Sequence, residues 1–253
     1  MSNQKIASLI KLNWTAAALH LAQGIAIVAL SRDFTLPISV SFLQFNPATQ
    51  NLEPTSTPLF DLSLPWLVAL FLFLSFLAHL TIVTVYRHRY VADLQKGINK
   101  ARWIEYSLSA SVMIVAIGLL VGIYDIASLI ALFGLIAIMN LCGLIMEVHN
   151  QTTKNTNWLS YWVGCLAGII PWVMIAIYLW AGADNGSQAP TFVYWIFVSI
   201  FVFFNCFAIN MFLQYKKIGP WANYLYGEKV YVILSLVAKS ALAWQVFAGT
   251  LRP

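Results

Sequence analysis

Seven long apolar stretches divide the chain, and each has about the 20 residues that a helix needs to cross a bilayer. Their approximate bounds are 9–30, 65–86, 102–123, 126–147, 158–181, 191–214 and 229–250. Only helices or closed barrels satisfy every backbone polar group in lipid, and these stretches lack the alternation over about ten residues that is typical of barrel strands. The pattern predicts an all-α membrane protein, in which residues 1–253 form a single domain of seven transmembrane helices.

The first connection, residues 31–64, is longer than the others and has a different pattern. Ile38, Val40 and Phe42 alternate with serines, which is the period of a β-strand. Prolines, which mark turns and strand ends, recur in it at positions 37, 47, 54 and 58. We expect a small β-hairpin that lies over one end of the bundle, as a lid, an oligomer contact or a passive cover.

The composition agrees with a membrane protein, since 60% of the residues are hydrophobic and only 9% are charged. Soluble domains have about a quarter of their residues charged, so most of this surface must face the lipid bilayer. The three cysteines lie in apolar stretches and indicate neither a disulfide framework nor a metal site. The polar first residues lead directly into a span, and no removable signal peptide is expected. The net charge of +5 does not by itself indicate nucleic acid, and no nucleophile–base arrangement supports an enzyme.

Lysine and arginine residues are concentrated in the loops on one side of the predicted bundle. Eleven lie on the side of the amino terminus, namely Lys5, Lys11, Arg87, Arg89, Lys96, Lys100, Arg102, Lys154, Lys216, Lys217 and Lys229. The opposite side has only Arg32 and Arg252. Because basic loops stay in the cytoplasm, the charges predict a cell-membrane protein with a cytoplasmic amino terminus and an extracellular carboxyl terminus.

A lysine lies near the middle of the last span. Lys239 is ten residues from Lys229, a distance of about 15 Å along a helix, which places it near the membrane midplane. A charge at this depth costs several kcal/mol and is by default a functional hypothesis. A buried amine is a suitable nucleophile, as lysines that form Schiff bases require. The alternatives are an ion pair that fixes helix packing and a transporter lysine.

Glu105 is the candidate acidic partner of Lys239. It lies near the end of its predicted span, so the pairing requires that helix to begin earlier than residue 102. Ser235, one turn before Lys239, would then lie beside the ion pair. Glu105, Ser109 and Met113 recur at intervals of four and share one helix face, which could follow a ligand from its charged end to its apolar body.

The other ionisable residues within the spans are His20, His79 and, near a helix end, Glu147. The two histidines share the layer of Lys239. They are either ordinary polar groups bonded across helices or the lining of a hydrated cavity that can receive a proton. Glu147 either closes the cytoplasmic ends of the helices or is an interfacial carboxylate.

Aromatic residues gather on the spans 158–181 and 191–214, where rings could hold a flat polyene between them. The candidates are Trp162, Trp172, Phe203 and Phe204, together with Pro171. Plain packing is the alternative interpretation of such stripes.

Several long motifs resemble those of the heliorhodopsins. RWIEYSLSASVMI (102–114) and ILSLVAKSALAWQVFAGTL (233–251) are similar to the third and seventh helices of that family. GCLAGIIPW (164–172) and NYLYGEKVYVILSL (223–236) resemble it too, and the resemblance covers the whole chain, including HLAQ at 20–23. The pair of carboxylates that ion-pumping rhodopsins have on the third helix is missing, with Glu105 where the first would stand. Ile136 stands where some relatives have a polar Asn.

The resemblance implies a retinal protein with a rhodopsin-like bundle. Lys239 would carry all-trans retinal as a protonated Schiff base, Glu105 would be its counter-ion, and Ser235 a neighbouring hydrogen-bond partner. His20 and His79 would line a cavity on the cytoplasmic side of the Schiff base. The retinal pocket or its surroundings would include Met113, Trp162 and Asn205.

The resemblance also implies a function and an assembly. Family members form homodimers through the first extracellular loop and the helices at 126–147 and 158–181. Most have a slow photocycle without ion pumping, while some viral members conduct protons. The expectation is therefore a light-sensing receptor read by a cytoplasmic partner. Light-driven proton transport or a light-gated proton channel is the alternative, and a retinal-free transporter is a third.

Overall fold

The computed structural model describes residues 3–253, and this part of the chain contains seven helices long and apolar enough to cross a membrane. Their bounds are Asn3–Leu30 (α1), Leu64–Val83 (α2), Lys100–Leu120 (α4), Ile126–His149 (α5), Leu159–Asp184 (α6), Thr191–Tyr215 (α7) and Tyr224–Val246 (α8). The predicted fold class, a bundle of seven helices with a hairpin after the first, is confirmed.

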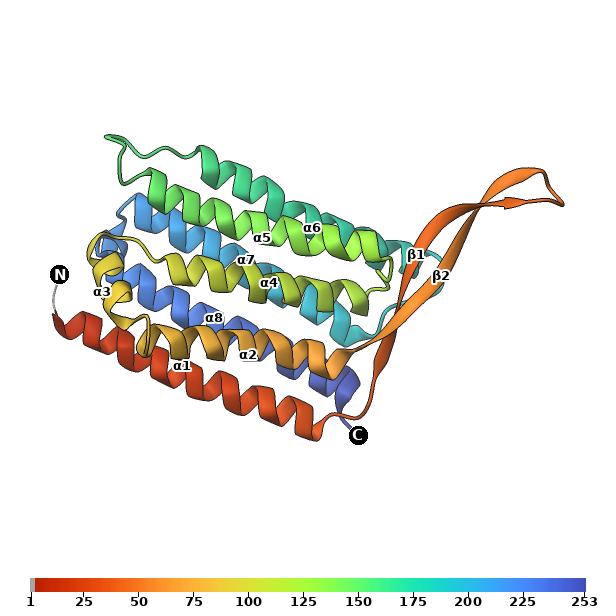
Figure 1. Cartoon of the computed structure of the whole chain (residues 1–253), viewed down its shortest axis with the longest axis horizontal. Helices are drawn as coiled ribbons and strands as arrows, with labels where there is room; N and C mark the ends of the chain where they lie inside the picture. Colours follow the sequence, from red (N-terminus) through yellow and green to blue (C-terminus); the bar gives the residue numbers. More distant parts are fainter. Residues whose placement is uncertain (1–2) are drawn as a thin grey trace.

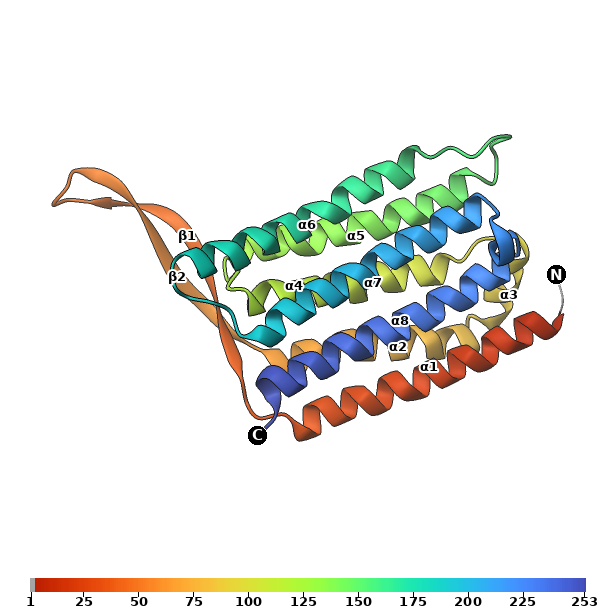
Figure 2. The same ribbon diagram turned by 180° about the vertical axis from the view of Figure 1, so that it is seen from behind.

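The helices lie side by side with their axes nearly parallel (Figure 1). From α1, neighbours follow in the order α2, α4, α5 and α6, while α7 and α8 cover the opposite side (Figure 2), where α8 also contacts α1. The chain begins at one end of the bundle and finishes at the other. We call the end with the N-terminus the amino-terminal end, and the end with the β-hairpin the hairpin end.

The short helix α3, Arg87–Gln95, was not predicted, because its charged sequence shows no membrane span. Tyr90 and Leu94 are four residues apart and share one face. Both are buried in a cluster with apolar residues of α1, α2 and α8. This anchor folds the connection between α2 and α4 back over the amino-terminal end.

The hairpin lies within the predicted loop, residues 31–64, and leans away from the bundle. Strands β1 (Thr35–Asn46) and β2 (Asn51–Ser63) pair in antiparallel register, with an irregularity after Ile38. Ile38 is buried in the main core, whereas Phe42 is 47% exposed. The expectation of a small flap lying over the bundle end is therefore wrong for the outer part, which projects beyond the helices (Figure 1). The inward-facing backbone groups of the two strands pair with each other, while those on the outer edges have no strand partner.

Asp125 anchors the base of the hairpin to the bundle. Its carboxylate accepts hydrogen bonds from Ser128 N (3.1 Å), which caps α5, and from Ser41 N of β1 (3.2 Å). These donors, the Ser128 backbone most of all, hold the pKa of Asp125 below its ordinary value. The stabilisation from a lowered pKa is present above the pKa of the unfolded chain and is lost as the pH falls through the folded-state pKa.

Replacing Asp125 by alanine is expected to free both amides, because the cap and the hairpin anchor share one acceptor. The local loss should be about 1 kcal/mol, as for other N-cap residues. Hydrogen–deuterium exchange should become faster at Ser41 and Ser128, while Asp125→Asn, which keeps an acceptor oxygen, should change it less. Unchanged exchange in Asp125→Ala would contradict the anchor.

Candidate functional site

A buried ion pair joins α8 to α4 in the interior of the bundle. Lys239 Nζ lies 2.9 Å from Glu105 Oε1 and donates to Ser235 Oγ at 2.6 Å. Ser75 of α2 donates to the same Glu105 oxygen at 2.6 Å. All four residues are buried, with Lys239 only 3% exposed. A buried charge pair with its hydrogen bonds satisfied is a rare arrangement within a membrane, and three helices contribute to this one.

The start of α4 explains how Glu105 reaches the lysine. Asn99 accepts a hydrogen bond from Arg102 N at 3.1 Å and caps the helix, which begins at Lys100. The lysine side chain points from Lys239 towards Ser235, one turn nearer the amino-terminal end. The earlier helix start and this direction of the side chain together remove the difference in depth that the sequence pattern indicated.

An apolar cavity of about 40 Å³ begins at this lysine. Its lining comes from α4, α5, α7 and α8: Tyr106, Ala110, Met113, Met139, Asn140, Phe204, Phe207, Ser235, Ala238 and Lys239. A second cavity of about 70 Å³ shares Met139, Asn140, Phe204 and Phe207 with it and continues towards α6. The space therefore has one charged end and an apolar, largely aromatic body.

Trp172 of α6 packs against the aromatic wall of these cavities. It is 3% exposed and packs edge-on against Phe201 and Phe204 of α7, with ring centroids 5.3 and 5.4 Å apart. Edge-to-face pairs of this kind are favourable beyond their area of contact. The aromatic stripes of α6 and α7 thus form part of the core, and Phe204 also lines the cavity.

His20 and His79 stack on each other, with ring centroids 5.7 Å apart and planes at 10°. His79 Nδ1 lies 2.7 Å from Asn13 Oδ1, while Asn13 Nδ2 donates to Leu9 O. Because the amide nitrogen is committed to a carbonyl, its oxygen faces the histidine, and Nδ1 carries the proton. Within residues 3–253, His79 Nε2 and both nitrogens of His20 have no hydrogen-bond partner.

Unpartnered buried nitrogens are rare and indicate ordered water or a proton-transfer role. The structure thus brings the two histidines together, as the hydrated-cavity interpretation requires. Asn13, which fixes the tautomer of His79, was not singled out from the sequence. It lies on α1 seven residues before His20, which is about two helical turns and places both on the same face.

The remaining predicted site residues fall into two groups. Met113 lines the cavity, and Ser109 is fully buried on the same face of α4, with a hydroxyl that has no hydrogen-bond partner among the described residues. Trp162 is 60% exposed, and Asn205 is exposed with its amide donating to Phe201 O. Neither Trp162 nor Asn205 lines the two cavities. A sequence motif indicates on which helix a residue lies, but the packing of the helices determines where its side chain points.

Asn140 contributes the polar group of the cavity wall that the sequence pattern missed. It is 6% exposed, and its amide donates to Ile136 O at 2.8 Å. Ile136 itself is fully buried. The polar side chain of this helix face therefore lies one turn beyond the position at which some relatives carry Asn.

A second buried charge cluster lies at the amino-terminal end. Arg102 forms salt bridges with Glu147 and Glu228, and Asn99 donates to both carboxylates, through N at 2.9 Å and Nδ2 at 2.7 Å. The guanidinium also lies over the Tyr231 ring, 3.8 Å from its centroid. Assigning Arg102 to a solvated loop was wrong, since it is only 4% exposed. The interpretation of Glu147 as a group that ties helix ends together is supported.

A family model described as Heliorhodopsin matches residues 9–251. No curated protein matches the sequence significantly. Among solved structures, the chain is similar to the light-driven proton pump LR (Mac) from Leptosphaeria maculans, with a TM-score of 0.68 and 15% identity over 98% of this chain and 94% of that one.

Two further solved structures are also similar. Cyanorhodopsin from the cyanobacterium Tolypothrix sp. has a TM-score of 0.64 and 14% identity, covering 99% of this chain and 96% of its own. Thermophilic rhodopsin has a TM-score of 0.61 and 14% identity, covering 98% and 94%. These likenesses establish the rhodopsin fold. The family match extends over nearly all of the sequence, so the chain belongs to the heliorhodopsin family, which implies a retinal chromophore.

Proposed function

We propose that the protein is a light receptor in which Nζ of Lys239 carries all-trans retinal as a protonated Schiff base, with Glu105 as its counter-ion. The observation that carries this proposal is the Lys239–Glu105 pair of 2.9 Å at the charged end of an apolar cavity. A cationic link needs a fixed anion, and Glu105 is the carboxylate in contact with Nζ.

The residues around the cavity fit such a group. An extended polyene needs an apolar, aromatic slot with a reactive amine at one end, which is the chemistry of this lining. About 40 Å³ is room for only one or two water molecules, so the polyene requires side chains to turn aside. Met113 and Met139 are flexible enough to do so, because methionine has three rotatable bonds and adapts to irregular space.

Retinal supplies the light absorption and the isomerisation. The chain supplies the electrostatics, since Glu105 stabilises a positive charge at Nζ while Ser235 and Ser75 hold the two charged groups in place. His79 offers an unprotonated nitrogen, Nε2, that can accept a proton leaving the Lys239 site. With His20 stacked on it, this pair is a suitable temporary acceptor.

A receptor is favoured over a pump by the distribution of buried ionisable groups. Among residues 3–253, each buried acidic or basic side chain lies at the level of Lys239 or towards the amino-terminal end: His20, His79, Arg102, Glu105, Glu147, Glu228 and Lys239. The core towards the hairpin end is made of apolar residues such as Ile27, Val68 and Val246. A proton path to both faces needs polar groups in both halves, so we propose a slow photocycle without ion pumping.

Illumination of cells or patched membranes that contain the retinal-loaded protein tests this choice. The expected result is a light-induced absorbance change that recovers slowly and is accompanied by no photocurrent. A sustained photocurrent would instead establish light-driven proton transport or a light-gated proton channel, the second candidate that the unpartnered histidine nitrogens leave open.

Replacing Glu105 by glutamine is expected to change the visible spectrum strongly. With the negative partner lost, the band should move to longer wavelength, or to the near ultraviolet if the linkage gives up its proton. Glu147→Gln is the matched control, because it also removes a buried carboxylate but one that contacts Arg102 and not Lys239, and its spectrum should stay that of the parent protein. An unchanged spectrum in Glu105→Gln would remove this residue from the role.

We also propose that the amino-terminal end faces the cytoplasm. Arg102 is buried and no longer counts as a loop residue. The amino-terminal end then has ten exposed lysine and arginine residues and the hairpin end has two, which still favours this orientation. A light-dependent partner would then dock at the amino-terminal end. Labelling of single cysteines by an impermeant reagent in intact cells should reach the hairpin and not the loop at Lys154.

A homodimer is the proposed assembly. The projecting part of the hairpin exposes Phe42, Leu43, Phe45 and Leu52, each by 47% or more. Such a cluster of large apolar side chains is typical of an interaction surface. Crosslinking between cysteines placed on two hairpins should give a dimer, and a monomer at all protein concentrations would contradict the proposal.

A further inference from the structure

A groove of about 370 Å³ lies on the outer face of the bundle between α2 and α4. Its walls are mostly apolar, and Leu77 of α2 and Ile104 and Leu108 of α4 are each 44% or more exposed. These residues belong to two of the helices that can cross a membrane. The groove therefore opens to the acyl chains of the bilayer.

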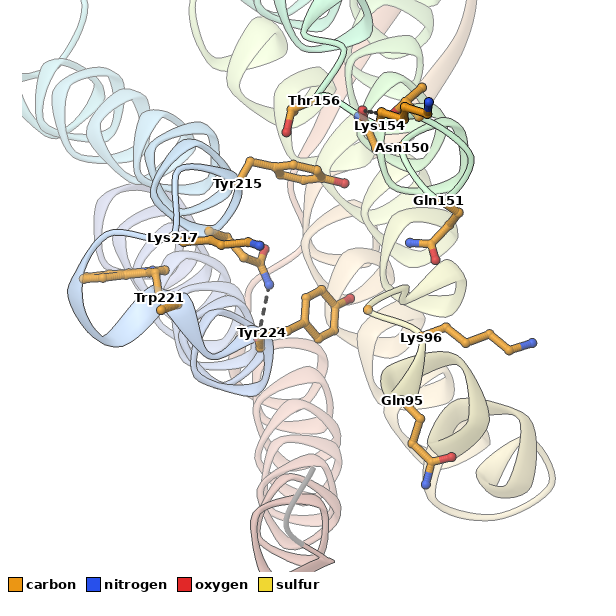
Figure 3. Close-up of a pocket in the computed structure, with 14 residues that line it drawn as sticks. Gln95, Lys96, Asn150, Gln151, Lys154, Thr156, Tyr215, Lys217, Trp221 and Tyr224 are labelled. Atoms are coloured by element: carbon orange, nitrogen blue, oxygen red, sulfur yellow. Dashed lines mark hydrogen bonds between the residues drawn. The ribbon is translucent and has the colours of Figure 1, made fainter.

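The surroundings of this groove differ from those of the pocket at the amino-terminal end of the bundle. That pocket is lined by residues of loops and helix ends, among them Lys154, Tyr215 and Tyr224 (Figure 3), and it faces the aqueous side. The groove shares no lining residue with it or with the cavity at Lys239. It is a separate site, and its ligands come from the lipid.

Glu105 contributes the charged group of the groove. Its Oε1 accepts hydrogen bonds from Lys239 Nζ and from Ser75 Oγ. Its Oε2 has no hydrogen-bond partner within residues 3–253, and it is not one of the unpartnered atoms that are fully enclosed. Glu105 as a whole is 7% exposed and lines the groove. Oε2 is therefore the atom of the ion pair that a molecule in the groove can reach.

The ion pair determines which kind of donor suits Oε2. The bilayer core has no water to satisfy an unpaired acceptor, which is costly there. The negative charge of Glu105 is already balanced by Lys239 at 2.9 Å, so a second cation would add an uncompensated charge inside the membrane. A neutral hydroxyl group donates to Oε2 without that cost.

The shape of the groove determines what the hydroxyl is attached to. Along α2 the lining extends from Leu74 to Ile82, which is about 12 Å of helix. Leu74 lies deeper in the membrane than Glu105, which is five residues after the start of α4 at Lys100. An elongated apolar groove with its acceptor near the amino-terminal end suits a single alkyl chain with a polar head.

We propose that the groove binds a membrane lipid with one alkyl chain and a neutral hydroxyl head, such as a long-chain alcohol or a monoacylglycerol. The hydroxyl donates to Glu105 Oε2, and the chain lies between α2 and α4 towards Leu74. The binding does not require retinal. Its consequence, a change in the strength of the counter-ion, rests on the proposed function of Glu105.

Photolabelling of the full chain in phosphatidylcholine nanodiscs tests the site. The probes are a long-chain alcohol with a diazirine in its chain and the methyl ether of the same alcohol, which has no donor. Mass spectrometry after digestion should find the alcohol on residues 74–82 and 101–108. The yield should exceed that of the ether about tenfold, the order that one hydrogen bond to a charged group supplies. Unlabelled dodecanol should compete, and dodecyl methyl ether should compete less.

Variants of small residues show whether the groove itself is the site. Ala78→Leu fills the α2 wall and should remove the preference for the alcohol over the ether. Ala101→Leu narrows the same groove from α4 and repeats the test if the first variant is not folded. Ala131→Leu is the matched control, since Ala131 is exposed on α5 and does not line the groove. Equal labelling by alcohol and ether in the unchanged chain, or an equal preference in all three variants, would overturn the proposal.

The visible spectrum separates this site from the photoreceptor. In the retinal-loaded protein, the alcohol should move the band to longer wavelength, because a hydrogen bond to Oε2 weakens the negative partner of the Schiff base. The ether should not move it. Selective labelling with an unmoved band would leave the groove site standing and contradict Glu105 as the counter-ion. A normal band without selective labelling would overturn the groove site and leave the photoreceptor standing.

Discussion

Replacing Lys239 by alanine is expected to abolish the visible absorption band that forms when all-trans retinal is added. Lys239 is the single buried lysine among the described residues, while the other lysines are exposed at the amino-terminal end. Among residues 3–253 no other lysine lines the cavity, so the loss should be complete and not partial. The absorption spectrum after reconstitution and removal of free retinal is the measurement.

Two controls separate chemistry from folding in this experiment. Lys229→Ala removes an exposed lysine from the same helix and should leave the band intact. Lys239→Ala alone leaves Glu105 as an uncompensated buried charge, which is destabilising. The double variant Lys239→Ala/Glu105→Gln removes both charges and should be folded yet colourless. A visible band in Lys239→Ala or in the double variant would contradict the assignment.

The second large effect is expected from Arg102→Gln. Two buried carboxylates, Glu147 and Glu228, would lose their guanidinium partner. Breaking a buried ion pair on one side costs about 3–5 kcal/mol, because the remaining charge is left without compensation. The variant should therefore unfold at a distinctly lower temperature, which thermal loss of the visible band or of helical circular dichroism measures.

Variants of neighbouring residues test whether charge is the cause. Lys100→Gln removes an exposed cation two residues away and should leave the melting temperature nearly unchanged. Combining Arg102→Met with Glu147→Gln and Glu228→Gln removes all the charges of the cluster and should recover most of the lost stability. Equal melting temperatures for Arg102→Gln and Lys100→Gln would show that the cluster does not hold the helix ends together.

Hydropathy predicted the spans well because an unpaired backbone polar group is so costly in lipid that each membrane-crossing segment must form a helix. It located the cores of the seven helices, with Lys239 inside the last of them. It could not locate α3, because a short polar helix is held by two side chains, Tyr90 and Leu94, and not by an apolar run. Likewise, α8 begins at Tyr224 and not at 229, since charged residues such as Glu228 can continue a helix inside the protein.

The site was predicted less completely than the fold. Lys239, Glu105, Ser235 and Met113 do meet, because spacing along a helix determines which of its residues share a face. The rotation of each helix about its axis is a property of packing between helices, and a single sequence does not reveal it. Trp162 therefore faces outwards. Ser75, one turn before His79 on the same face of α2, offered a signal that was not used.

Arg102 shows that the sequence alone also does not reveal whether a charged side chain is buried. Next to Lys100 and near a helix start, it has the sequence context of a solvated residue. Only the meeting of α4, α5 and α8 supplies the two carboxylates that allow its burial. The inferred orientation rests on many loop charges, so it does not change when Arg102 is left out of the count.

Reductive trapping is the most direct test of the central claim, that Lys239 is the residue that carries retinal. The retinal-loaded protein would be treated with sodium borohydride under illumination, which reduces a carbon–nitrogen double bond to a stable amine, and then digested for mass spectrometry. The account predicts a retinyl adduct on the peptide that contains Lys239 and on no other lysine. A coloured protein whose adduct lies on a different lysine, or that yields no adduct, would contradict it.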